Sequence, residues 1–183
     1  IAEINPKAIQ IRHQQGWVDE VYADMRNLIR RVRQVIDANE VISIAYEGNI
    51  VDIWEAFADE NIKVDIGSDQ TSLHNPWAGG YYPAGYSFEE SNRMMTEDPG
   101  RFREAVYQSL RRQVVAINRH TKRGTYFFDY GNAFLLEASR AGADVMNSIG
   151  EFRYPSYVQD IMGPVCFDYG FGPFRWVCCS NDP

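Results

Sequence analysis

Apolar residues recur at helical spacing in four parts of the chain. Between Trp17 and Ile36 they fall three or four positions apart, which predicts an amphipathic helix of about five turns. The same spacing predicts helices from Ile50 to Asp59, from Gly100 to about His120, and from Ala133 to Ala141. The apolar stripe of the third helix consists of Phe102, Val106, Leu110, Val114 and Ile117.

Short apolar runs rich in β-branched or aromatic residues lie between these helices. They predict strands at Ile1–Ile4, Val41–Tyr46, Ile62–Ile66 and Thr125–Asp129. Strands and helices that alternate with short connections are typical of a parallel sheet with crossover helices. The pattern therefore predicts an α/β fold with an open parallel sheet.

Capping residues sharpen the helix boundaries. Ser87 followed by Glu90 forms a capping-box pattern for a helix through Met95. Asp98 followed by Pro99 is the expected start of the long helix. Residues 143–183, in contrast, are aromatic and rich in Gly and Pro, with one short helical candidate near 157–162, and we interpret them as a binding or interface segment.

The polar stretch Asp69–Gly85, DQTSLHNPWAGGYYPAG, follows the third predicted strand. Its Gly and Pro residues exclude a core helix or central strand, so it is a loop. Ligands bind at the carboxyl ends of the strands in open α/β sheets. Glu3, Asn49 and Tyr130 also follow strands, and we expect them to converge with this loop on one ligand-binding edge.

Composition narrows the possible partners. The formal net charge of −7 argues against nucleic acid, and we interpret the arginines of the first long helix as a solvated face. No run reaches the roughly 18 apolar residues of a membrane span. The start of the chain has no signal-peptide pattern, so we expect a cytoplasmic protein.

Individual side chains suggest little chemistry by themselves. Glu3 suits a ribose contact but, taken alone, is more typical of a surface carboxylate, and His74 suits an acid–base role or, more often for a lone histidine, a structural hydrogen bond. Arg175, in an irregular segment, suits a carboxylate ligand. We interpret Cys166, Cys178 and Cys179 as reduced bystanders without metal-binding spacing. These residues do not name a reaction.

Three long motifs do point to a particular reaction. DQTSLHNPWAGGYYPAG, GTYFFDYGNAFLLEASRAGAD and YPSYVQDIMGPVCFDYGFGPFRWVC together resemble the urocanase family, and the similarity covers nearly the whole chain. The resemblance implies a Rossmann-like domain that binds NAD⁺ within a lyase of histidine catabolism. This family adds water to urocanate to give imidazolonepropionate, with NAD⁺ as an electrophile. It also implies a homodimeric intact enzyme.

The resemblance assigns site residues position by position. Arg175 corresponds to the arginine that anchors the substrate carboxylate, and Glu3 to the acidic residue at the adenosine ribose. The remaining cofactor-binding positions are Asn49, Ile50, Gln70, Thr71, Ser72, Leu73, His74, Tyr81, Tyr82 and Tyr130. Ala8, Ile50 and Leu73 depart from the family pattern, and one residue is inserted around 78–80; these differences affect local contacts.

Two functional segments of the family are not found in residues 1–183. We expect its Gly-rich phosphate loop before Ile1 and its cysteine signature after Pro183, so we interpret 1–183 as one domain truncated at both ends. We expect this fragment to be inactive by itself, with the flanking domains of the parent chain as partners. The alternatives are a dinucleotide-binding or assembly module without chemistry and a hydride-transferring dehydrogenase; for the latter no Tyr-Lys or His-Asp arrangement is found.

Overall fold

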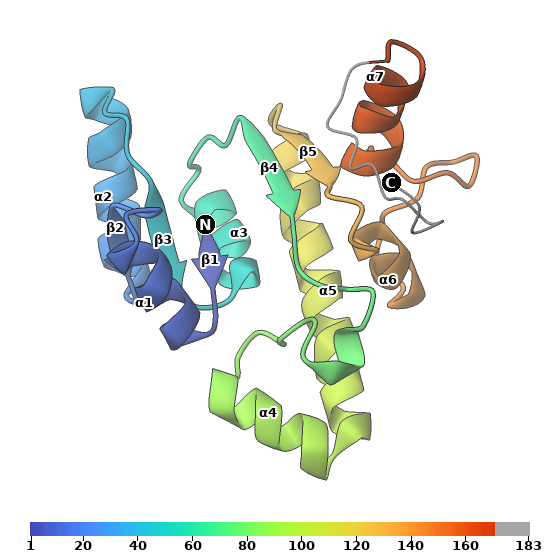
Figure 1. The fold of residues 1–183 in the computed structure, drawn as a ribbon, viewed down its shortest axis with the longest axis horizontal. Coiled ribbons are helices and arrows are strands. Elements are labelled where there is room, and N and C mark those ends of the chain that lie inside the picture. The colour runs from blue at the N-terminus through green and yellow to red at the C-terminus, as the bar shows by residue number, and fades with distance from the viewer. Residues whose placement is uncertain (171–183) are drawn as a thin grey trace, which may run out of the picture.

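Short parallel strands and the helices between them form the framework of the computed structural model, which describes residues 1–170 (Figure 1). The strands are β1 (Ala2–Glu3), β2 (Glu20–Tyr22), β3 (Ile44–Glu47), β4 (Ile66–Asp69) and β5 (Tyr126–Asp129). The helices are α1 (Pro6–Gln14), α2 (Met25–Ala38), α3 (Ile50–Asp59), α4 (Phe88–Glu97), α5 (Pro99–Thr121), α6 (Phe134–Arg140) and α7 (Gly163–Phe167). Two further turns are η1 (Pro76–Ala78) and the π-helical η2 (Tyr157–Met162).

The strands form two parallel sheets, although we expected one. β3 lies between β1 and β2, with Ala2 opposite Tyr46 and Glu20 opposite Ile44. β4 pairs with β5 from Ile66 opposite Tyr126 onward. A strand has two hydrogen-bonding edges, and β1 and β2 occupy both edges of β3. β4 therefore cannot join beside β3 and pairs with β5 instead.

Local signals define several boundaries correctly. α3 spans the predicted residues, and both halves of the capping box of α4 are formed between Ser87 and Glu90. The side chain of Asp98 caps α5, and the predicted stripe on α5 is buried along its whole length. Periodicity therefore identified the elements whose apolar faces form the core.

The beginning of the chain corrects one expectation. The predicted helix from Trp17 is instead strand β2 followed by α2, which begins after its capping residue Asp24. Helix α1 begins at Pro6, and the Asn5 side chain caps it by accepting a hydrogen bond from the backbone N–H of Lys7. Among the arginines of α2, Arg31 pairs with Glu20 and Glu40.

The main core lies between the β4–β5 sheet and helices α3, α5 and α6. In Figure 1, α5 passes behind β4 and β5. The ring of Trp54 on α3 packs edge-on against Phe127 of β5, with ring centroids 5.9 Å apart. Gly67 on β4 permits this contact, because a Cβ there would lie 2.3 Å from the Trp54 ring. A smaller core, formed by Ile9, Val18 and Ala45, supports the other sheet.

A histidine is part of the contact between α3 and α5. The side chain of His120 is 1% exposed, and its ring lies edge-on to Trp54 with centroids 5.0 Å apart. Its Nε2 atom is 3.0 Å from the carbonyl oxygen of Trp54, so Nε2 carries a proton and donates it. Burial lowers the pKa of His120, and the neutral ring is the form that the fold favours.

We predict that the free energy of unfolding falls as the pH drops through 6.5, the ordinary pKa of histidine. The unfolded chain binds the proton more readily than the folded one, so stabilisation by neutral His120 is complete above this pH and is lost below it. Each unit of pKa lowering corresponds to about 1.4 kcal/mol. Chemical denaturation between about pH 5.5 and 7.5 measures the slope. The variant His120→Gln should have a smaller slope, and equal slopes would contradict the prediction.

Candidate functional site at the strand ends

The carboxyl ends of the strands carry polar residues from both sheets. Glu3 ends β1, Asn49 follows β3, Asp69 ends β4 and Tyr130 follows β5. The arrowheads of β1, β4 and β5 point toward the same end of the molecule in Figure 1. The residues fall into two groups, one at β1 and β3 and the other at β4 and β5.

The first group is formed by Glu3, Asn49 and Tyr82. Asn49 caps α3 by accepting a hydrogen bond from the N–H of Val51 at 2.9 Å, and its amide donates to the carbonyl oxygen of Tyr82 at 2.8 Å. Glu3 accepts a hydrogen bond from Arg12 at 3.2 Å. Partial burial raises the pKa of Tyr82, while the hydrogen bond from its hydroxyl to Asn92 lowers it and the charge of Glu3 raises it.

The second group is built around the carboxylate of Asp69, which is 1% exposed. Its Oδ1 accepts hydrogen bonds from the N–H and hydroxyl of Thr71, at 3.0 and 2.6 Å, and from the amide of Asn132 at 2.8 Å. Its Oδ2 accepts one from the amide of Gln113 on α5 at 2.8 Å. A single buried carboxylate thus holds together the loop after β4, the turn after β5 and the long helix.

Tyr81 supports the Asp69 carboxylate indirectly, through Gln113. Its hydroxyl donates to Oε1 of Gln113 at 2.9 Å, which directs the amide nitrogen of Gln113 toward Asp69. Burial raises the pKa of Tyr81 well above its usual range, and the charge of Asp69 raises it further, so the phenol stays protonated. Tyr81 and Leu73 are both buried, and their side chains pack in the core.

The rest of the loop reaches the surface of this edge. The side chains of Gln70, Ser72 and His74 are exposed, and His74 Nε2 lies 3.2 Å from the carbonyl oxygen of Gly131. Ile50, the first residue of α3, is half-buried against the core. A tight turn shapes the loop at Gly80, where a Cβ would lie 2.1 Å from the carbonyl oxygen of Ser72.

Tyr130 presents an aromatic surface beside this loop. Its side chain is 46% exposed, and its ring stacks on that of Tyr157, with centroids 5.1 Å apart and planes 4° apart. Tyr157 comes from η2, within the segment that we interpreted as a binding or interface region. The stacked pair joins this segment to the end of β5.

The two groups are connected through adjacent residues of the loop. The backbone of Tyr82 binds Asn49, while the side chain of Tyr81 belongs to the hydrogen-bond network of Asp69. The predicted site residues of residues 1–170 thus lie at or after the carboxyl ends of strands from two sheets, and not at the edge of a single sheet as expected. Arg175, Cys178 and Cys179 lie outside the described residues.

The edge combines exposed hydrogen-bonding side chains with an exposed aromatic ring, held by buried groups. Such a surface suits an elongated polar ligand with ring systems. In residues 1–170 no group of His, Cys, Asp and Glu is arranged to hold a metal ion. In the same part of the chain, no helix combines the length and apolar character that a membrane crossing requires.

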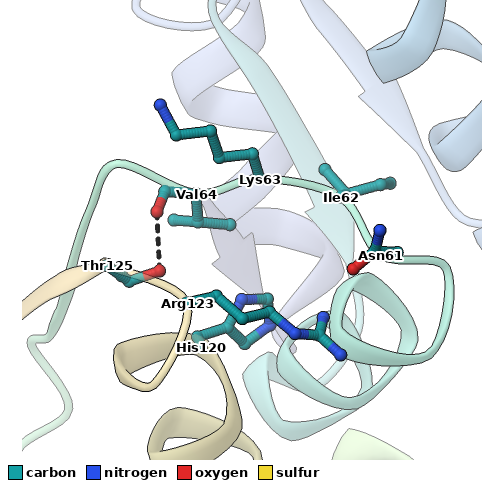
Figure 2. Close-up of a pocket in the computed structure, with 7 residues that line it drawn as sticks. All are labelled: Asn61, Ile62, Lys63, Val64, His120, Arg123 and Thr125. Atoms are coloured by element: carbon teal, nitrogen blue, oxygen red, sulfur yellow. Dashed lines mark hydrogen bonds between the residues drawn. The ribbon is translucent and has the colours of Figure 1, made fainter.

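A cavity of about 220 Å³ lies at the opposite end of β4 and β5 (Figure 2). Figure 2 shows the hydrogen bond from the Thr125 hydroxyl to the carbonyl oxygen of Val64, with His120 and Arg123 near it. The lining residues are Asn61, Ile62, Lys63, Val64, His120, Arg123 and Thr125. Residues 61–64 precede β4, and His120, Arg123 and Thr125 precede β5. The cavity is therefore separate from the strand-end edge.

Sequence reasoning missed two members of the Asp69 network, Gln113 and Asn132. Gln113 does leave a signal, because it lies three positions after Leu110 and four before Ile117, within the buried stripe of α5. A polar side chain at a core position needs a buried hydrogen-bond partner. The partner could not be identified from the sequence, because Asp69 is 44 residues away.

Comparison with known proteins identifies the family of the chain. The family model described as "Urocanase Rossmann-like domain" matches residues 1–161. The whole chain is 53% identical to a probable urocanate hydratase of Caenorhabditis elegans, 54% to one of Dictyostelium discoideum, and 52% to the urocanate hydratase of Homo sapiens. It spans 28% of the length of each of these relatives. The Rossmann-like fold class is thereby confirmed, and the chain belongs to the urocanase family.

Proposed function

We propose that this chain is the cofactor-holding domain of a parent protein that adds water to urocanate and forms imidazolonepropionate. The observation that carries the proposal is that the predicted site residues among 1–170 lie at or after the carboxyl ends of strands in both sheets, in a chain more than 50% identical along its whole length to urocanate hydratases. Because the chain covers 28% of these relatives, the reaction belongs to the parent protein.

The described residues fit NAD⁺ as the cofactor. Gln70, Ser72 and His74 offer exposed hydrogen-bonding groups, and Tyr130 offers an exposed ring for stacking. In this proposal Glu3 accepts hydrogen bonds from the adenosine ribose, a role that an acidic residue at a strand end performs in dinucleotide folds. Bound NAD⁺ would supply an electrophilic nicotinamide carbon.

The remaining assigned residues would support the cofactor site from its core side. Leu73 and Tyr81 are buried, so we propose that they fix the backbone of the loop rather than offer side chains to the ligand. Asn49 is occupied by its two hydrogen bonds, and with Ile50 it would set the start of α3 against the cofactor. Thr71 would hold the loop in place, because its hydroxyl and N–H are bound to Asp69 and its carbonyl oxygen to Asn132.

The substrate and the surroundings of the domain complete the proposal. Urocanate carries a carboxylate, and we propose Arg175 as its anchor, since a guanidinium binds a carboxylate through two parallel hydrogen bonds. Residues 143–183 would form part of the substrate site or interface. The parent would act in histidine catabolism in the cytoplasm, as a homodimer, without nucleic-acid or membrane partners.

The second candidate function is a dinucleotide-binding or assembly module without chemistry of its own. The 28% coverage favours it for residues 1–183 taken alone, because the parent's other segments would complete the catalytic site. The two candidates are compatible if the domain holds NAD⁺ and its parent performs the reaction.

We predict that the parent protein consumes urocanate only while it holds NAD⁺. Turnover is followed by the loss of urocanate absorbance before removal of NAD⁺, after removal and after its return, and activity should disappear and then recover. Residues 1–183 alone with added NAD⁺ serve as the control and should leave urocanate unchanged. Steady-state production of NADH would contradict the proposal and support a dehydrogenase instead.

We also predict a selective effect of Arg175→Ala in the parent. Removing one partner of a buried charge pair should weaken urocanate binding by about 2 to 5 kcal/mol, while the content of bound NAD⁺ stays unchanged. Arg119→Ala, which removes an exposed pair with Asp59, is the matched control and should alter neither. Urocanate affinity that is unaltered in Arg175→Ala would remove this residue from the site.

A further inference from the structure

We propose that Asn132 is a positioning residue that clamps the 70–74 loop to the turn carrying Tyr130, an inference that rests on the cofactor site proposed above. The amide nitrogen of Asn132 donates to Asp69 Oδ1 at 2.8 Å and to the carbonyl oxygen of Thr71 at 2.6 Å. One side chain from the turn after β5 thus forms hydrogen bonds with the last residue of β4 and with the loop that follows it.

The orientation of this amide is fixed by its partners. If it were reversed, its oxygen would face the carboxylate of Asp69 and the carbonyl of Thr71, which are both acceptors. Asn132 is 8% exposed, so it acts on a ligand through the segments that it joins. Those segments carry Gln70 and His74 on one side and Tyr130 on the other.

Among residues 1–170, two other hydrogen bonds join this segment to the turn. The N–H of Tyr130 donates to the carbonyl oxygen of Asp69 at 3.3 Å, and exposed His74 contacts the carbonyl oxygen of Gly131. Without Asn132, Asp69 would keep its bonds to Thr71 and Gln113. A variant at position 132 therefore loosens the connection between the two segments and removes one of the hydrogen bonds of the carboxylate.

Fold stability by itself does not explain this asparagine. Its Oδ1 atom is buried and has no hydrogen-bond partner among residues 1–170. A buried acceptor without a partner costs free energy, so the residue is not optimised for stability. The benefit that remains is the clamp made by its nitrogen.

The test compares Asn132→Ala with Asn118→Ala in the full-length parent. Asn118 is a matched control because it is also an asparagine that is 8% exposed, and its partners, Asp144 and Tyr154, do not belong to the Asp69 network. Both variants should lower the melting temperature. Only Asn132→Ala should weaken NAD⁺ binding, by about tenfold or more, while KM for urocanate at saturating NAD⁺ stays within about twofold.

The variant Asn132→Asp separates the clamp from side-chain size. It keeps the shape of the residue but places a second carboxylate against Asp69, so NAD⁺ affinity should fall at least as far as in Asn132→Ala. Affinity restored to the wild-type level in Asn132→Asp would overturn the proposal, because no amide donor remains. Equal NAD⁺ affinity in Asn132→Ala, Asn118→Ala and the wild type would also overturn it.

Hydrogen exchange of the cofactor-free parent gives a readout independent of function. Asn132→Ala should speed exchange at residues 71–74 and 130–132 relative to the wild type, and Asn118→Ala should leave these amides unchanged. If the wild type does not bind NAD⁺, the proposed function fails while this measurement still tests the clamp. Unchanged exchange in Asn132→Ala would refute the clamp even if the parent binds NAD⁺ and hydrates urocanate.

Discussion

The buried carboxylate of Asp69 and the hydrogen bonds that replace its water determine the form of the strand-end site. A charge removed from water is tolerated only when protein groups satisfy it. Here the donors are neutral and come from three segments, through Thr71, Asn132 and Gln113. Any arrangement that buries Asp69 without these donors is costly, so the requirement to satisfy one carboxylate fixes the loop, the turn and the helix relative to one another.

Buried and exposed residues therefore have different tasks at this edge. Leu73 and Tyr81 hold the loop from the core side, while Gln70, His74 and Tyr130 face outward. The fixed groups preorganise the exposed ones, which lowers the entropic cost of ordering a loop around a ligand. In the proposed function, a domain that holds candidate cofactor residues in this way would serve a parent protein whose remaining catalytic groups lie in other segments.

Sequence patterns predicted much of the fold and the position of the candidate residues after strands. The stripe on α5, the capping box of α4 and the alternation of strands and helices are local features, and all three are present. What the sequence could not show depends on distant contacts. Strand β2 was hidden in a helical pattern because it is stabilised by pairing with β3, and β4 was excluded from β3 because both edges of that strand are occupied. Asn132 and Gln113 acquire their roles only when the fold brings them to Asp69.

A structure of the parent protein with bound NAD⁺ tests the central claim most directly. We expect the dinucleotide to lie across the strand ends, with Gln70, His74 and Tyr130 in contact with it and with the hydrogen bonds from Asn132 to Asp69 and Thr71 retained. A dinucleotide bound instead at the opposite end of β4 and β5, near the cavity beside His120 and Arg123, would contradict the account.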